Sequence, residues 1–368
     1  MLTYCTNIHP AESWDDIFTN VRRFVPGVKK KVSSADSFPI GLRLSGRAAT
    51  ELNPAAAQHF HEWCLENDCF VSTLNGFPYG TFHHVPVKET VYLPDWRHPE
   101  RVRYTKQLAQ YLSLWLPDGQ KGSISTVPVG FKDCISPDDD PIIRSHLVQA
   151  LEHLEEIAQK TGKEIFLAVE PEPACVLETT LDVVQFFEKL DLPKSLRPFL
   201  AVCYDCCHQA LQYESPVQSL DLLAANDIRV GQVQVSSALR LENPDIRTLQ
   251  RFSEPCYLHQ TVGRLQDGTL LRFHDLDQAL IAAPADVLEW RIHFHIPVFI
   301  DRLQDCASTQ PFLKKILPLF DADIPLEVET YTWTVLPPDL QTTTVTDSII
   351  REIDWVKKYR PMQTSRKM

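Results

Sequence analysis

Acidic residues follow two short apolar runs near the middle of the chain. Glu170 comes directly after the run 165–169, and Asp205 ends the run 199–205, with His208 three residues further on. Apolar runs of this length are typical of strands buried on both faces of a parallel sheet, and α/β folds place their chemistry at the carboxyl edge of that sheet. The pair therefore predicts a metal site or an acid/base site. The alternative is that Glu170 and Asp205 only cap the helices that follow.

Polar residues near the ends of later strand-like runs extend this set. They are Gln234, His293, His295 and Glu329. Carboxylate, imidazole and amide oxygen groups are ligands of Mg²⁺, Mn²⁺ and Zn²⁺. In a barrel the ligands come from different strands and converge on the axis, so their wide spacing along the chain is expected.

Each of the last two strand-like runs contains two polar residues of one kind at alternate positions. In a strand over 291–299, His293 and His295 would point to the same side, and we expect them to line the pocket. A hydrogen-bonded core histidine is the alternative. Glu327 and Glu329 share one face of the strand 325–333. Two acids on a buried face are costly without a cation or a basic partner, which again predicts a site there.

Other chemical motifs are weak or absent. Cys203 and Cys206 have the spacing of zinc knuckles and redox pairs, but no second such pair exists, so we interpret them as packing residues. The chain has no phosphate loop, dinucleotide-binding glycine motif or serine-hydrolase elbow. Nucleotide-dependent and serine-hydrolase functions therefore have no support.

Strand-like and helical segments alternate along the chain, which predicts a parallel sheet. Eight strands and one extra strand indicate a closed (β/α)₈ TIM barrel in a single domain over 1–368. An insertion with the extra strand is expected at 238–300, between strands seven and eight. The irregular stretch 77–99 is long and aromatic, as candidate lid loops are.

The composition of the 368 residues limits the partners. A net charge of −12 argues against nucleic acid, because a phosphate-binding surface needs a basic stripe. No run of about 20 apolar residues exists, so no transmembrane segment is expected. The N-terminus shows no secretion signal, and ten dilute cysteines favour a reducing, cytoplasmic setting. A homo-oligomer remains open.

The motifs Ala-Val-Glu170-Pro, Tyr-Asp205-Cys-Cys-His208 and Glu329-Thr-Tyr331 resemble those of the xylose-isomerase-like TIM barrels, the sugar isomerase and epimerase superfamily. The resemblance implies that Glu170, Asp205 and Glu329 bind a metal and that His208 contacts the substrate. The strand-seven histidine of the superfamily falls on Gln234. Its amide oxygen could still bind the metal, or His295 could substitute from the added strand.

A narrower resemblance is to the EboE-type metabolite traffic proteins of this superfamily. It is carried by the N-terminal Leu-Thr-Tyr-Cys-Thr-Asn-Ile-His-Pro, by Ser-Ser-Ala-Leu-Arg-Leu after strand seven and by His-Phe-His-Ile-Pro-Val-Phe. It implies a cytoplasmic role in making or exporting a specialised metabolite. Proteins of the same pathway would then be partners.

These observations support a metal-dependent isomerase or epimerase that acts on a small hydroxy-carbonyl or sugar-like substrate. The cofactor would be a divalent ion: Mn, Zn, Mg, Fe or Co. Glu170 and Glu329 would move the proton, and His208, His293 and Arg240 would contact the substrate. The first alternative is a non-catalytic metabolite-binding barrel with a degenerate site. A metal-dependent hydrolase or endonuclease is the second.

Overall fold

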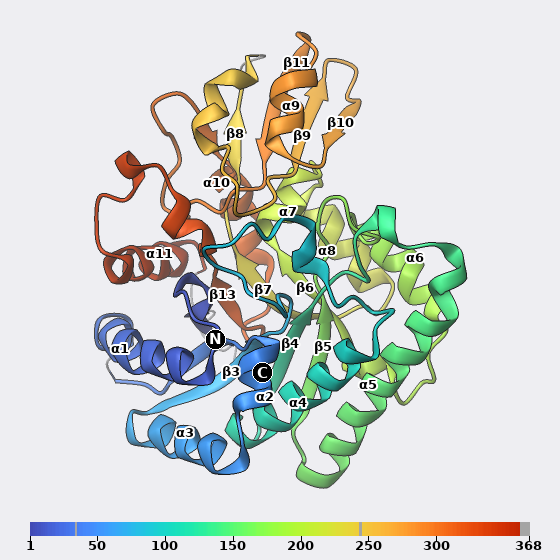
Figure 1. Cartoon of the computed structure of the whole chain (residues 1–368), viewed down its shortest axis with the longest axis vertical. Coiled ribbons are helices and arrows are strands. Elements are labelled where there is room, and N and C mark those ends of the chain that lie inside the picture. Colours follow the sequence, from blue (N-terminus) through green and yellow to red (C-terminus); the bar gives the residue numbers. More distant parts are fainter. Residues whose placement is uncertain (34, 243–244, 361–368) are drawn as a thin grey trace, which may run out of the picture.

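The computed structural model describes residues 1–33, 35–242 and 245–360. Eight parallel strands form one sheet in the order β1-β13-β7-β6-β5-β4-β3-β2. An isolated parallel bridge between Cys5 and Gly41 joins the two ends of the sheet. The (β/α)₈ barrel predicted from the sequence is confirmed, and Figure 1 shows it in the lower part of the molecule.

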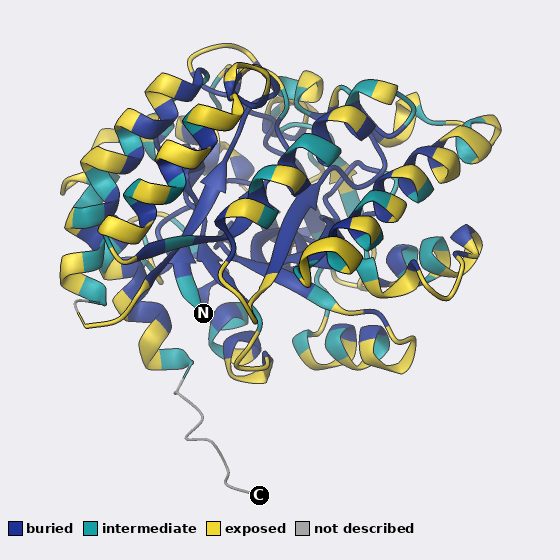
Figure 2. Ribbon diagram, turned by 90° about the horizontal axis from the view of Figure 1, so that it is seen from below, coloured by how far each residue is buried: buried dark blue, intermediate teal, exposed yellow. Residues whose placement is uncertain are grey.

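The barrel strands are short and begin at the end of the barrel opposite to the acidic residues. Their bounds are β1 Leu2–Tyr4, β2 Phe38–Arg43, β3 Cys69–Asn75, β4 Lys121–Thr126, β5 Glu164–Val169, β6 Leu200–Asp205, β7 Val230–Val235 and β13 Leu326–Val328. Almost all of their residues are buried, because helices cover the outside of the sheet. Figure 2 shows the dark-blue strands surrounded by helices whose outer turns are exposed.

Most of the helices around the barrel are amphipathic, and several begin at a side-chain N-cap, such as Ser13 before α1 and Thr179 before α6. Their bounds are α1 Trp14–Val32, α2 Gly46–Glu51, α3 Pro54–Glu66, α4 Pro99–Trp115, α5 Asp140–Thr161, α6 Thr180–Leu190, α7 Cys206–Leu211, α8 Pro216–Ala225, α10 Gln310–Ile316 and α11 Val345–Tyr359. α5, for example, buries Ile143, Leu147, Leu151 and Leu154 on one face, and Gly162 ends it at φ 71°. None of the helices in the described ranges combines the length and hydropathy of a membrane span.

The insertion between β7 and β13 forms a second, antiparallel sheet. Its strands are β8 Leu239–Leu241, β9 Thr261–Leu265, β10 Leu270–Phe273, β11 Val287–Ile292 and β12 Ala307–Ser308, in the order β10-β9-β11-β8-β12. The helix α9 Leu276–Ala282 packs on it, and the sheet has a hydrophobic core of its own that includes Phe252, Trp290 and Phe294. It forms the upper part of Figure 1.

Two strands differ in their bounds from the sequence prediction. The strand expected over 325–333 is β13, which ends at Val328, and Tyr331–Val335 form a 3₁₀ helix. The strand expected over 291–299 is β11, which ends at Ile292, and residues 293–299 form no strand. The insertion also contains five strands instead of one. Its edge strands β10 and β12 are short and partly exposed, so their sequences lack the long apolar runs that mark a buried strand.

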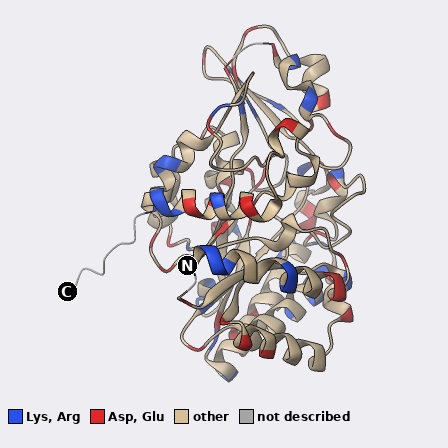
Figure 3. Cartoon of the chain, turned by 90° about the vertical axis from the view of Figure 1, so that its left-hand side faces the viewer, with Lys and Arg blue, Asp and Glu red and all other residues tan. Residues whose placement is uncertain are grey.

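Charged residues are distributed over the outer helices. On the side shown in Figure 3, Lys and Arg alternate with Asp and Glu, and no continuous basic stripe is visible. Several pairs follow the helical spacing, such as Arg47–Glu51 at 2.6 Å and Lys160–Glu156 at 3.2 Å. These exposed pairs contribute little to stability.

Candidate metal centre

Three carboxylates meet at the carboxyl ends of the barrel strands. Glu170 directly follows β5, Asp205 is the last residue of β6, and Glu329 directly follows β13. One carboxylate oxygen from each lies within 4.8 Å of the others, and all three side chains are buried. The short parallel strands place these acids together although 159 residues separate the first from the last in the chain (329 − 170).

The carboxylates are held in place by neighbouring polar groups. The amides of Asn7 and Asn75 donate to Glu329 Oε1 at 2.8 and 3.0 Å. Asp205 Oδ1 accepts from the backbone N–H of His208 at 2.9 Å, as the N-cap of α7, and from Ser236 Oγ at 2.8 Å. One oxygen of Glu329 and one of Asp205 are thus fixed, and the second oxygen of each is available to bind something else.

The electrostatics of this cluster favour a cation. Burial raises the pKa of Glu170 well above its usual value, and the charges of Glu329 and Asp205 raise it further. Burial and the charge of Asp205 likewise raise the pKa of Glu329. Glu170 Oε2 and Asp205 Oδ2 are buried without a hydrogen-bond partner among the described residues. Buried like charges and unpartnered oxygens are costly, and a divalent ion would remove both costs. The donor set therefore fits such an ion.

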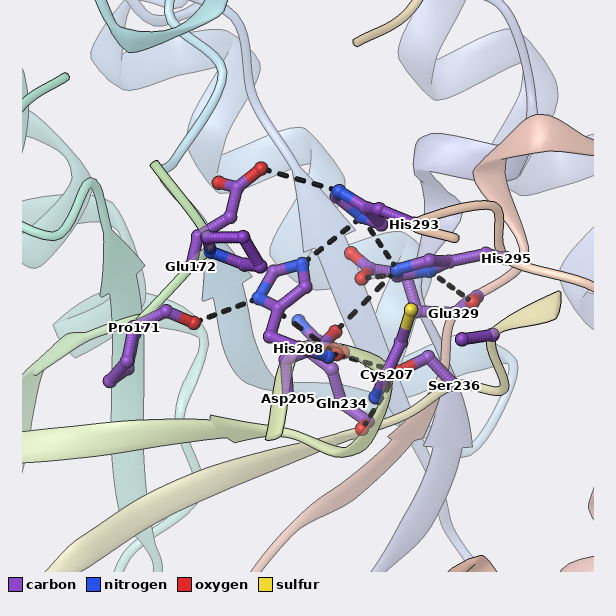
Figure 4. A network of polar contacts seen from close by, with 12 residues as sticks. Pro171, Glu172, Asp205, Cys207, His208, Gln234, Ser236, His293, His295 and Glu329 are labelled. Carbon is purple, nitrogen blue, oxygen red and sulfur yellow. Dashed lines mark hydrogen bonds and ion pairs between the residues drawn. The ribbon is translucent and has the colours of Figure 1, made fainter. Parts of the chain in front are cut away.

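Three histidines lie beside the carboxylates (Figure 4). The Nε2 atoms of His208 and His293 are 3.1 Å apart, and so are those of His293 and His295. His295 Nε2 is also 3.9 Å from Asp205 Oδ2. Burial lowers the pKa of His208 to about 3 and that of His295 to about 4, so both imidazoles are neutral at neutral pH.

The opposite ring nitrogen of each histidine has an oxygen acceptor. His208 Nδ1 donates to the carbonyl of Pro171 at 2.9 Å, His293 Nδ1 to Gln260 Oε1 at 2.6 Å, and His295 Nδ1 to the carbonyl of Glu329 at 2.9 Å. Because these oxygens only accept, the hydrogen of each neutral ring is on Nδ1. The three Nε2 atoms are therefore unprotonated and face one another.

A pocket opens over the carboxylates and the histidines. It is lined by Glu170, Glu172, His208, His293, His295 and Glu329, and on its other side by Phe77, Phe82, Val87, Lys88, Val91 and Tyr92 from the segment between β3 and α4. The space that the centre of a water molecule can reach is about 60 Å³. That is room for a few waters.

The structure thus brings together six of the residues that the sequence predicted for the site: Glu170, Asp205, His208, His293, His295 and Glu329. Gln234 lies next to them in β7, in register with Asp205 on one side and Glu327 on the other. Both polar atoms of its amide are buried without a partner among the described residues.

Arg240 is not brought to the pocket, contrary to the role expected for it. It lies in β8, where its guanidinium pairs with Glu242 and with Glu289 at 3.2 Å. The sequence placed it just past strand seven, but the chain turns there into the antiparallel sheet of the insertion. Arg240 therefore pairs with Glu242 and Glu289 and does not reach the pocket.

Several pocket residues were not predicted. Asn75 ends β3, so the strand-end rule that found Glu170 could have found it, and Asn7 lies in the 3₁₀ helix Thr6–Ile8 that follows β1. Glu172 accepts from Tyr92 at 2.9 Å and from Gln260 at 3.0 Å. Burial raises the pKa of Glu172 to about 7. Gln260 comes from an irregular part of the insertion, where the sequence pattern contains no indication of its place.

Comparison with solved structures identifies the fold. The chain is similar to a xylose isomerase-like TIM barrel protein from Mycobacterium smegmatis in complex with magnesium, with a TM-score of 0.55 and 8% identity over 97% of this chain and 95% of that chain. It is also similar to an IolI protein with a bound zinc atom, with a TM-score of 0.52 and 14% identity over 98% and 99% of the chains. It is similar as well to an L-ribulose 3-epimerase, with a TM-score of 0.50 and 9% identity over 100% of this chain and 99% of that chain.

At these identities the likeness shows a xylose isomerase-like TIM barrel. No family model matches the chain, and no curated protein matches it.

Proposed function

We propose that this xylose isomerase-like barrel binds a divalent metal ion through Glu170, Asp205 and Glu329 and isomerises or epimerises a small hydroxy-carbonyl or sugar-like molecule. The observation that carries the proposal is the convergence of three buried carboxylates at the ends of β5, β6 and β13. Gln234 lies beside them and offers an amide oxygen in place of the strand-seven histidine that the resemblance leads us to expect. Oxygen donors of this kind suit Mg²⁺ and Mn²⁺ and are also found around Zn²⁺.

The residues divide the chemistry between them. When bound, the ion would polarise a substrate carbonyl and make the neighbouring C–H more acidic. Glu170 follows β5 and Glu329 follows β13, and in the sheet these two strands lie on either side of β6 with its Asp205. One of the two glutamates would take a proton from carbon, and the other would return it. Burial and the neighbouring charges raise the pKa of both acids well above the usual value, which favours their holding a proton. Asn7 and Asn75 hold Glu329 in position for this step.

Metal binding is the first test. Glu170→Gln keeps the size of the side chain and removes its charge, so the affinity for Mn²⁺ measured by calorimetry should fall by about tenfold or more. Glu152→Gln on the exposed face of α5 is the matched control, and its affinity should equal that of the unchanged protein. Equal Mn²⁺ affinity in both variants would remove the proposed mechanism.

Proton exchange is the second test. The metal-loaded protein would be incubated in D₂O with a set of ketoses and aldoses, and each sugar examined by NMR. Deuterium at the carbon next to the carbonyl, absent with Glu170→Gln, is expected for a substrate. If no sugar exchanged hydrogen for deuterium although the metal binds tightly, the result would contradict the isomerase function and favour the alternative described next.

The alternative is a barrel that binds or carries a metabolite without changing it. Gln234 favours it, because superfamily enzymes are expected to have a histidine at this place. The likeness to EboE-type metabolite traffic proteins favours it too, and implies a cytoplasmic role in making or exporting a specialised metabolite. A ligand that co-purifies with the protein and stays unchanged after long incubation with metal would support this function.

A further inference from the structure

The two faces of the insertion sheet differ in polarity. Its four longest strands lie side by side in the order β10-β9-β11-β8 (Figure 1). Residues such as Leu241, Trp290 and Ile292 belong to the hydrophobic core of the insertion on one face. The alternate residues point to the opposite face. They include one arginine from each strand, and these four define the arginine face: Arg240, Arg264, Arg272 and Arg291.

The strand register makes these arginines neighbours. Arg291 stands directly opposite Arg240, and Arg264 stands directly opposite Glu289, two residues before Arg291. Neighbouring strands are about 4.8 Å apart, so the four strands span only about 15 Å. Like charges that stand directly opposite each other destabilise a sheet, so this face needs negative charge to offset its arginines.

The carboxylates on the arginine face do not balance its positive charge. Glu289 pairs with Arg291 at 2.7 Å and with Arg240 at 3.2 Å. The same carboxylate is 3.6 Å from Arg264, and Glu242 pairs with Arg240. Within the described part of the chain, four arginines thus share two acidic partners, which leaves two positive charges (4 − 2). In a chain with a net charge of −12, such a local excess attracts anions.

Arg272 has a neutral partner that itself lacks an acceptor. Arg272 is exposed on the edge strand β10, and its Nη2 donates to Gln212 Oε1 at 3.0 Å. The amide nitrogen of Gln212 is buried and has no hydrogen-bond partner among the residues that the structure describes. A buried donor without an acceptor is costly. An anion beside Arg272 would accept from both side chains and remove this cost.

Tyr213 holds two of the guanidinium groups in position. The Cζ atoms of Arg291 and Arg264 lie 3.8 and 4.7 Å from the centre of its ring, and its hydroxyl donates to the carbonyl of Glu289 at 2.9 Å. A stacked guanidinium loses less conformational freedom when it binds a ligand than a free one does. The side chains of Arg264 and Arg240 are still 41% and 21% exposed, so a ligand can reach them.

We propose that the arginine face, together with Gln212, binds the phosphate group of a small molecule. The planar fork of a guanidinium matches two phosphate oxygens at once. A phosphate monoester carries about −1.5 to −2 charges at pH 7, which corresponds to the two positive charges left on the face. The span of about 15 Å suits one or two phosphate groups and is too short for the basic stripe that nucleic acid needs. This site lies outside the metal centre and does not depend on the proposed function.

Calorimetric titration of the full chain with pyrophosphate tests the site. The protein is freed of metal and kept in excess chelator, so that no phosphate binds through an ion at the carboxylates. Wild type is compared with Arg264→Gln, Arg272→Gln and the double variant. Arg103→Gln is the matched control for loss of one positive charge, since Arg103 is exposed on α4 and pairs with Glu100 at 2.7 Å.

Wild type and Arg103→Gln should bind one pyrophosphate per chain with equal affinity. Arg264→Gln and Arg272→Gln should each weaken the affinity by about tenfold, the effect of losing one charge-assisted hydrogen bond, and the double variant should weaken it further. Because Arg272 is exposed on an edge strand, Arg272→Gln should keep the circular dichroism of wild type. A loss of binding in this variant then does not reflect misfolding.

Three outcomes would overturn the inference. The first is the absence of pyrophosphate binding in wild type. The second is equal weakening in Arg103→Gln and in the variants of the arginine face, which would mean attraction by overall charge. The third is displacement of pyrophosphate by a peptide of six glutamates at the same concentration, which would assign the face to acidic protein segments. Since no metal is present, none of these outcomes bears on the proposed function.

Discussion

His208 Nε2 and His293 Nε2 lie 3.1 Å apart, although 85 positions separate the two residues in the chain. One belongs to the barrel and the other to the insertion. The contact therefore joins two structural units at the pocket, and the insertion completes the site that the barrel strands begin.

Asp205 is one of the three carboxylates of the proposed metal site, so Asp205→Asn should reduce metal binding. Asparagine caps a helix about as well as aspartate, so the start of α7 should be preserved. We expect the metal content after loading with Zn²⁺ and Mn²⁺ to fall by about tenfold for each ion, measured by elemental analysis. Asp138→Asn, on an exposed turn, should keep the wild-type content. Unchanged content in Asp205→Asn would contradict the role of Asp205 as a metal ligand.

Gly41 closes the barrel against β1 and leaves no room for a side chain. A Cβ at this position would lie 2.7 Å from Glu327 Cδ and 2.9 Å from the carbonyl oxygen of Tyr4. Gly41→Ala should therefore lower the free energy of unfolding by about 1–3 kcal/mol in a urea titration.

Gly27 is the matched control for Gly41, since it lies inside α1 with no atom within 4 Å of an added Cβ. Gly27→Ala should raise the free energy of unfolding by about 0.5–1 kcal/mol. If Gly41→Ala were as stable as Gly27→Ala, the barrel would not be closed as tightly as described.

Glu352 makes stability depend on pH. Its carboxyl is buried in α11, and burial raises its pKa to about 7, although Thr330 and the backbone N–H of Val298 donate to it. An acid with a raised pKa holds more protons in the folded than in the unfolded state between pH 4.5 and about 7, so stability falls as the pH rises through this window.

Glu352→Gln removes this titration and keeps the hydrogen-bonding oxygen. With excess chelator present, the variant should equal wild type near pH 4.5 and exceed it by about 3 kcal/mol above pH 8. Urea titrations at several pH values measure the difference. Glu156→Gln, an exposed residue of α5, should show no such trend. A constant difference between Glu352→Gln and wild type at every pH would contradict the raised pKa.

Lys88 connects the segment over the pocket to the insertion. Its ammonium group donates to Asp275 at 2.6 Å and to the carbonyl of Glu254 at 3.3 Å. We propose that residues 77–99 act as a lid, because this segment lines the side of the pocket that faces the carboxylates and the histidines. Lys88→Ala should then increase hydrogen exchange in this segment by about two- to fivefold, the effect of losing a partly exposed ion pair.

The control for Lys88 is Lys121, which pairs with Glu164 at the opposite end of the barrel. Lys121→Ala should leave exchange over the pocket unchanged. Equal exchange in Lys88→Ala and wild type would show that other contacts, such as those of Phe82 with Tyr257 and Tyr331, hold the segment down alone.

The sequence was sufficient to predict the barrel and its carboxylates, because short buried strands and their polar ends are local patterns. Glu170 and Asp205 each stand where an apolar run stops, and Glu329 alternates with Glu327 in the last strand-like run; the parallel order of the sheet brings these strands' ends together. The expectation that His293 and His295 face the same way is also met, since their Nε2 atoms are 3.1 Å apart, although they lie beyond the end of β11.

Apart from the hairpin that Asp267-Gly268 indicates, which β9 and β10 form, the insertion could not be predicted from local patterns. Its strands pair out of sequence order, with β11 between β9 and β8, so neighbours such as Arg240 and Glu289 are far apart in the chain. Gln260 reaches His293 from outside any strand. Positions of this kind depend on the tertiary arrangement and have no periodic signature in the sequence.

The placement of His293 and His295 between β11 and β13 has a consequence for the ancestry of the protein. A barrel that gains such an insertion acquires donor atoms in the same genetic event, before any residue of its own strands changes. Conversely, loss of residues 239–308 by deletion would leave the eight strands and the three carboxylates but remove two imidazoles. Relatives of this chain could therefore differ in chemistry according to the length of a single loop.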